Sequence, residues 1–196
     1  EKRGAVKESI GSSLGIHLDR QPDFERMYVI KVKGSSEEVF AELGKFGDRR
    51  RNYLKLRFVD VKRVTGKANE VGSVIRYIAR PFGLSLELVL ARAMSNRTLL
   101  YEVGDKFADH GKLIFDVNPT RDGNNSLLIY TAFDFKKGRL LPGKVFWRLY
   151  KHLFPAFIHD VVWNHALCRI KENVEQTGCR DQRASTAGVA EIPRVT

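Results

Sequence analysis

Few polar side chains in this sequence could do chemistry, and four of them interrupt segments that are otherwise apolar. Arg92 continues a row of leucines at every second position. Tyr77 and Tyr101 each belong to an apolar row of the same spacing in two other segments. Asp160 lies at helical spacing from apolar residues towards the C-terminus. An Arg in apolar surroundings needs a carboxylate partner, a cavity mouth or an anionic ligand, and tyrosine hydroxyls can orient a ligand or move a proton. These four residues are candidates for polar ligand contacts or for acid/base chemistry.

The sequence lacks the residue motifs that several other catalytic chemistries require. The five histidines show no three-ligand spacing such as His-x-x-x-His, so the sequence predicts no metal and no other cofactor. The segment Gly11-Ser-Ser-Leu-Gly15 lacks the Lys-Ser/Thr ending of a phosphate-binding loop, and no serine occurs in a Gly-x-Ser-x-Gly setting. Hydrolase, kinase and Rossmann-type functions are therefore disfavoured.

The net charge of +11, from 34 basic and 23 acidic residues, favours anionic partners. Eight cations lie between Lys45 and Arg63 against two acids, and a second basic cluster runs from Lys136 to Lys151. For any single cation, a solvated surface position is the simpler interpretation. Nucleic acid is disfavoured as a partner, because no RNP, zinc-finger or helix-turn-helix signature accompanies the charge.

The 196 residues predict one domain with tails. Residues 1–24 and 178–196 are expected to be tails, the latter flexible, and residues 25–177 the folded domain. The longest run without a charged side chain spans 11 residues (123–133), too few for a membrane helix. Two cysteines outside any Cys-x-x-Cys pair favour a reducing, cytoplasmic location. The absent initiator Met leaves processing open.

Hydrophobic periodicity predicts an α+β domain. A strand over 28–34 precedes a helix over 35–43, and a second short helix is possible from Asp48. Six strands joined by hairpin-length links follow, which requires antiparallel neighbours; they are expected over 55–65, 72–80, 84–94, 97–104, 111–118 and 126–136. A helical pattern covers 144–177, with a break near Leu153 because Pro155 removes a backbone donor.

This order of elements resembles the helix-grip fold of the START, pollen-allergen and polyketide cyclase (SRPBCC) superfamily. The matching segments are Tyr28-Val-Ile-Lys-Val-Lys-Gly-Ser-Ser-Glu-Glu-Val-Phe40, Val71-Gly72-Ser73-Val74 and Asn125-Ser-Leu-Leu-Ile-Tyr-Thr131. The resemblance covers about residues 27–177. It implies a curved antiparallel sheet of about seven strands around a long C-terminal helix, enclosing a cavity for an apolar or amphipathic small molecule. No motif indicates a particular enzyme of the superfamily.

Alternation along each strand then predicts which side chains face that cavity. Asp160 is a candidate partner of Arg92, a polar anchor in the cavity, or a carboxylate that points to water. The predicted ligand-binding residues are Tyr77, Leu88, Leu90, Arg92, Leu99, Tyr101, Phe115, Ile129, Thr131 and Phe133 on the sheet, and Phe146, Leu149, Leu153, Phe157, Asp160, Val161 and Asn164 on the helix.

The function predicted first is binding or transport of a lipid-like molecule, with the cations from Lys136 to Lys151 docking on an anionic membrane surface. The alternative is a polyketide cyclase or aromatase-like enzyme that uses the same cavity, with Arg92, Tyr77, Tyr101 and Asp160 as its acid/base candidates. The third is a protein-interaction adaptor. Oligomeric state and ligand identity are not encoded in any motif.

Overall fold

The computed structural model describes residues 2–16, 18, 21–79, 84–104, 108–135 and 157–177. Three of the predicted ligand-binding residues, Phe146, Leu149 and Leu153, lie outside these ranges. The same holds for the basic cluster from Lys136 to Lys151, the break predicted near Pro155 and the expected C-terminal tail.

Seven antiparallel strands form one sheet in the order β1-β7-β6-β5-β4-β3-β2. Strands β2 to β7 are therefore a meander, and β1 closes the order by pairing with β7. The elements are α1 (Lys2–Leu14), β1 (Phe24–Val32), α2 (Ser36–Leu43), β2 (Val59–Thr65), β3 (Val74–Ala79), β4 (Leu84–Met94), β5 (Thr98–Gly104), β6 (Ala108–Pro119) and β7 (Asn125–Phe135), with a C-terminal helix over 157–177. The predicted fold class, α+β with a helix-grip arrangement, is confirmed. Among the described helices, none is long and apolar enough to cross a membrane.

The start of α2 follows directly from its sequence. The Ser35 side chain accepts a hydrogen bond from the Glu38 backbone N–H, and the Glu38 carboxylate accepts one from the Ser35 N–H in return. This capping box satisfies two donors that a helix N-terminus leaves open. The second short helix considered from Asp48 is absent, because residues 44–51 form turns.

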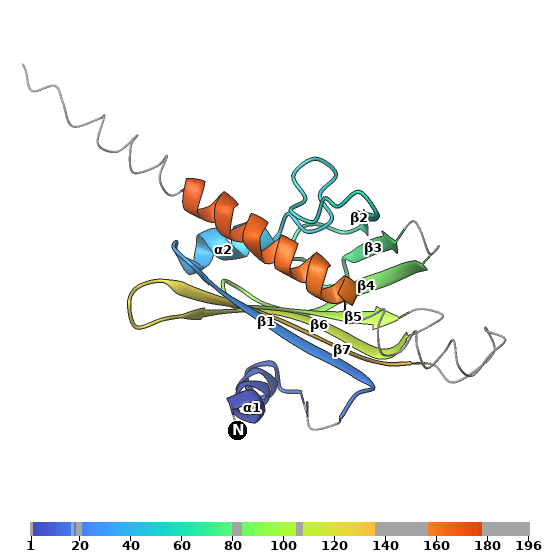
Figure 1. Cartoon of the computed structure of the whole chain (residues 1–196), viewed down its shortest axis with the longest axis horizontal. Coiled ribbons are helices and arrows are strands. Elements are labelled where there is room, and N and C mark those ends of the chain that lie inside the picture. Colours follow the sequence, from blue (N-terminus) through green and yellow to red (C-terminus); the bar gives the residue numbers. More distant parts are fainter. Residues whose placement is uncertain are drawn as a thin grey trace, which may run out of the picture.

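The sheet has one apolar cluster on each face, and a different helix covers each of them. On the inner face, residues of all seven strands pack with α2 and with the C-terminal helix. On the outer face, Leu100, Ile114 and Leu128 pack against α1. Figure 1 shows the C-terminal helix and α1 on opposite sides of β1, β6 and β7. The inner cluster is the larger one, and it contains the candidate site.

The expectation of a tail over residues 1–24 is wrong for residues 2–14, which form α1. Ile10 and Leu14 of this helix are 2% and 3% exposed, and Leu18 after it is also buried. Each removes apolar area of the outer sheet face from water, which provides the stabilisation that the weak periodicity did not indicate. Residue 24 also belongs to the sheet, because β1 begins at Phe24.

Candidate functional site

Most of the predicted ligand-binding residues of the sheet lie together on its inner face. Tyr77 packs at the margin of the inner cluster, on the favoured one of the two faces that the sequence of β3 allows. Thr131 is 5% exposed and pairs with Leu113, a member of the cluster. The fully buried members are Leu88, Leu90, Leu99, Tyr101, Phe115 and Ile129. Their placement agrees with the sequence analysis, and their role in binding a ligand stays a prediction.

Aromatic rings pack against one another in the middle of this interior. Phe46, from the turn after α2, contacts Tyr53 in a stacked geometry with ring centroids 5.8 Å apart. It contacts Tyr101 and Phe115 edge to face, each at 5.7 Å. Trp163 of the C-terminal helix completes the cluster, with its ring centroid 5.8 Å from that of Phe115. Edge-to-face aromatic pairs add to the stability that burial alone gives, so these rings join the sheet, the turn and the helix.

Three tyrosine hydroxyls lie in this apolar interior. Burial raises the pKa of Tyr53, Tyr77 and Tyr101 above its ordinary value, because the charged phenolate loses its hydration. The positive charge of Arg63 opposes the rise of the pKa at Tyr53 and Tyr101 without cancelling it. The three hydroxyls therefore stay protonated at neutral pH, so each can donate a hydrogen bond to a ligand but cannot serve as a base.

One end of the site is built around His159, in the first turns of the C-terminal helix. Its ring packs against Phe24 and Phe133, with centroid distances of 4.8 and 5.8 Å, and its Nδ1 accepts a 3.2 Å hydrogen bond from Trp163 Nε1. Burial lowers the pKa of His159 to about 4, so the imidazole is neutral at neutral pH. Within the described ranges, no three His, Cys, Asp or Glu residues group as metal ligands. The sequence predicts that Phe133 on β7 faces inward, and its contact with His159 of this helix agrees with that orientation.

Of the three alternatives for Asp160, a pair with Arg92 does not occur, because Arg92 contacts the end of α1 instead. The Tyr28 hydroxyl donates a 2.7 Å hydrogen bond to Asp160 Oδ1, and Arg26 Nε lies 3.9 Å from the same oxygen. The side chain of Asp160 is 48% exposed, which places it at the edge of the interior. This carboxylate therefore fixes the beginning of the helix against β1.

Arg92 lies on the outer face of the sheet, which corrects its predicted inward orientation. The register of β4 with β5 shifts between Leu90 and Arg92, and this bulge reverses the alternation. After it, Ala93 packs on the inner cluster and Met94 on the outer one. The Arg92 guanidinium donates to the backbone carbonyls of Leu14 and Gly15 at the end of α1. It therefore fixes α1 and contacts no part of the interior site.

The inner stripe of the C-terminal helix also differs from the predicted one. Phe157 and Val161 are 70% and 37% exposed, and Asn164 is exposed as well. The buried stripe lies on a different side of the helix; its members are Val162, Trp163, Ala166, Leu167, Ile170 and Val174. At about 100° per residue the centres of the two stripes are roughly 130° apart, a little over a third of a turn. The predicted stripe continued a pattern from residues 146–153, which lie outside the described ranges.

Sequence reasoning missed several residues of the interior. Phe46 and Tyr53 come from the loop after α2, where no period marks an inner face. Arg63 has the same parity in β2 as the buried Val59 and Val61. For Trp163 a signal existed, because Trp163, Leu167, Ile170 and Val174 repeat at spacings of four, three and four up to the end of the helix. His159 and Tyr28 could be assigned only once the helix was placed against β1.

No known protein family model matches this sequence, and no curated protein matches it either. Solved structures match through their fold. A START superfamily protein from Mycobacterium smegmatis aligns with a TM-score of 0.52 and 13% identity, covering 78% of this chain and 98% of that one. The KanY protein aligns with a TM-score of 0.58 and 14% identity over 80% and 99% of the two chains. A protein of unknown function from Staphylococcus aureus aligns with a TM-score of 0.54 and 12% identity over 81% and 99%.

These similarities show that the chain shares its fold with these proteins, one of which is a START superfamily protein. The identities are too low to transfer a ligand or an activity from any of these proteins, since one fold supports many functions. Only the residues of the interior can therefore indicate what this chain binds.

Proposed function

We propose that this protein binds an apolar or amphipathic, lipid-like small molecule between the inner face of the sheet and the C-terminal helix. The observation that supports this most is the aromatic cluster of Phe46, Tyr53, Tyr101, Phe115 and Trp163 among aliphatic neighbours. Small-molecule sites are commonly lined by apolar and aromatic side chains with a few polar groups that set orientation. Here those polar groups are the tyrosine hydroxyls.

Native mass spectrometry of the purified protein, followed by organic extraction, tests this proposal. We expect a co-purifying lipid-like molecule in the wild-type protein and its loss in Ala166→Leu. Ala166 is 0% exposed on the inner side of the C-terminal helix, so a larger side chain takes up space next to the sheet. Ala41→Leu is the matched control, because Ala41 is exposed on α2. A molecule bound equally by Ala166→Leu, with circular dichroism showing that this variant folds, would argue against an interior site.

A cyclase-like enzyme is a weaker alternative. Of its four acid/base candidates, Arg92 contacts α1 on the outer face, and Asp160 accepts a hydrogen bond from Tyr28 at the edge of the interior. Tyr77 and Tyr101 remain in the interior as protonated donors. An adaptor role would be favoured instead if neither extraction nor added ligands reveal a binding site.

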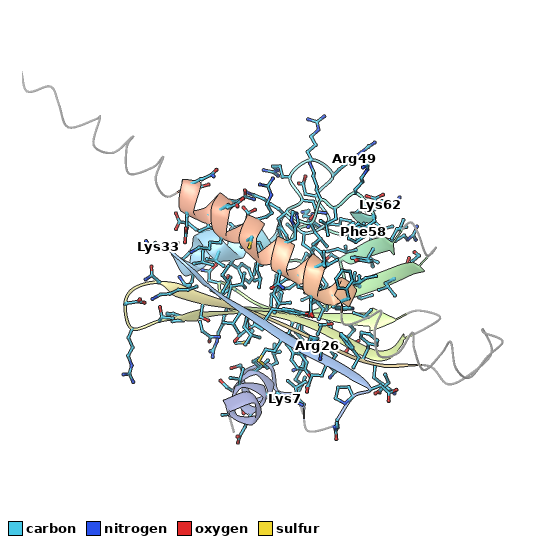
Figure 2. The ribbon with its side chains drawn as sticks, in the orientation of Figure 1. Lys7, Arg26, Lys33, Arg49, Phe58 and Lys62 are labelled. Carbon is cyan, nitrogen blue, oxygen red and sulfur yellow. The ribbon has the colours of Figure 1, made fainter. Side chains whose placement is uncertain are left out.

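We also propose an anionic membrane surface as the source or destination of the ligand. Arg49, Arg50 and Arg51 are exposed in the loop between α2 and β2, and Lys55, Arg57 and Lys62 are exposed after them. In Figure 2, Arg49 projects from this loop away from the sheet. Asp48, the acid beside these cations, accepts hydrogen bonds from the backbone N–H groups of Arg50 and Arg51, which lower its pKa. Clustered cations of this kind favour anionic lipid surfaces.

A further inference from the structure

Two buried hydrogen-bond donors in the interior have no acceptor within the described part of the chain. They are the Tyr53 hydroxyl and Arg63 Nε, both enclosed by protein atoms. Tyr53 is only 3% exposed. Buried donors are normally paired, and an unpaired one loses its bonds to water without replacement.

The contacts of Arg63 hold it in place and leave its Nε–H free. Its Nη2 donates to the backbone carbonyls of Gly44 and Phe46, both at 2.8 Å. Its backbone N–H donates to the Gly47 carbonyl at 2.7 Å. Gly47 has φ +75°, and a Cβ there would lie 2.8 Å from Arg63 N. The close approach of these two backbone segments therefore requires glycine. The guanidinium is therefore positioned by backbone contacts before any ligand is present.

Tyr53 and Arg63 both contact Phe46, one through the ring and the other through the backbone carbonyl. The Tyr53 ring stacks on the Phe46 ring, while Arg63 donates to the Phe46 carbonyl. The charge of Arg63 acts on the Tyr53 hydroxyl. Glu42, a buried acid whose charge also reaches this hydroxyl, already accepts from Lys45 Nζ and from Asn173 Nδ2. No free carboxylate of the described residues is thus identified beside the two donors.

A guanidinium and a phenol hydroxyl together match the hydrogen-bonding needs of an anionic oxygen. We propose that Arg63 Nε and the Tyr53 hydroxyl bind the carboxylate of an amphipathic ligand whose apolar part lies along Tyr101, Phe115 and Trp163. This inference depends on the proposed function, and it narrows the ligand class to apolar acids. Protein atoms enclose both donors, so the proposal requires residues 44–58, which contain neither helix nor strand, to rearrange when the ligand enters.

The test compares decanoate with decanol, two probes of equal chain length that differ in charge, by isothermal titration calorimetry at pH 7.5. We expect the wild-type protein to bind decanoate at least about tenfold more tightly. In Tyr53→Phe we expect this ratio to fall severalfold while decanol binding stays the same. Since this substitution leaves the net charge unchanged, a fall in the ratio cannot come from the general attraction of a basic protein for anions.

Tyr130→Phe is the matched control, because the Tyr130 hydroxyl donates to Glu25 on the outer side of the sheet. It should leave the probe ratio unchanged. Arg63→Lys is the second test variant; it keeps the charge, loses Nε–H and should also lower the ratio. If Arg63→Lys fails to fold, Tyr53→Phe alone tests the carboxylate site. We expect Tyr53→Phe to fold, because removal of an unpaired hydroxyl should leave its urea midpoint unchanged or raise it.

The possible outcomes separate the inference from the proposed function. Equal affinities for the two probes in the wild type, or an unchanged ratio in Tyr53→Phe, would overturn the carboxylate site and leave a neutral apolar ligand. A clearly lower urea midpoint in Tyr53→Phe would show that the hydroxyl has an internal partner such as a bound water, which also overturns the site. Failure of both probes to bind would overturn the proposed function itself, and the carboxylate site with it.

Discussion

The hydroxyl of Tyr28 on β1 donates a 2.7 Å hydrogen bond to Asp160 in the first turn of the C-terminal helix. Burial and this bond raise the pKa of Tyr28, so the hydroxyl remains a donor at all ordinary pH values. At the other end of the same helix, the Glu175 carboxylate accepts from the Lys33 backbone N–H at 3.0 Å. Polar contacts to β1 and to the residue after it thus fix both ends of the helix, while apolar packing holds its middle.

Tyr28→Phe should lower the free energy of unfolding by about 1 kcal/mol, the usual contribution of a partly exposed hydrogen bond. Urea denaturation of Tyr28→Phe, Asp160→Ala and the double variant measures this. Because both single variants remove the same bond, the double variant should lose less than the sum of the two. Strictly additive losses would show that Tyr28 and Asp160 do not stabilise the protein through each other.

Stability should depend on pH through His159. Its pKa is lowered to about 4 in the folded protein, mainly by burial, against an ordinary 6.5, so between these values the unfolded chain binds a proton that the folded one does not. The free energy of unfolding should therefore decrease as the pH falls from 6.5 towards 4. We expect a loss of about 2 kcal/mol, because the ring keeps some contact with solvent.

Urea denaturation at several pH values, with His159→Gln as the variant, measures this loss. The variant should remove most of the pH dependence in that window. His165→Gln, on the same helix, is the control and should keep it. A wild-type protein whose unfolding free energy is constant between pH 4 and 6.5 would show that His159 is protonated without cost.

Arg92→Ala should loosen α1 and leave the interior intact, since Arg92 donates to the carbonyls of Leu14 and Gly15. Hydrogen exchange should show faster exchange of the α1 amides, and decanoate should bind as before. Arg76→Ala, which removes an exposed strand arginine paired with Glu87, is the control for a general loss of charge. Weaker decanoate binding in Arg92→Ala alone would instead support the inward orientation that the sequence suggested.

The order of the elements could be predicted because each strand and turn carries its own local signal. The capping box at Ser35 and the alternation in β1 are examples, and hairpin-length links then require antiparallel neighbours. The inner face of β5, β6 and β7 could be predicted for the same reason. Alternation fixes the face for as long as the strand stays regular.

The orientation of Arg92 could not be predicted, because a bulge depends on how β4 meets β5 and has no mark in the row of leucines. The loop after α2 contributes Phe46 and Tyr53 to the interior through tertiary packing, which periodicity does not record. For the C-terminal helix, two apolar stripes exist in the sequence, and only its placement on the sheet selects the one with Trp163. The missed residues therefore lie where long-range contacts decide.

The loop between α2 and β2 that carries Arg49, Arg50 and Arg51, here called the basic loop, is expected to bind vesicles that contain anionic lipid. Replacing Arg49, Arg50 and Arg51 by Gln should weaken cosedimentation with phosphatidylserine vesicles at low salt by more than tenfold, since each cation near such a surface contributes about 1 kcal/mol. Because added salt screens exposed charges, wild-type binding should also weaken at high ionic strength.

A control with the same loss of charge separates a local surface from net charge. Lys33, Arg121 and Arg169 are exposed outside the basic loop, and their joint replacement by Gln removes three charges as well. In Figure 2, Lys33 lies at one end of β1, apart from the loop that carries Arg49. If the membrane contacts the basic loop, the control variant should bind nearly as well as the wild type. Equal weakening of both variants would mean that only net charge attracts the protein, and docking through this loop would have to be abandoned.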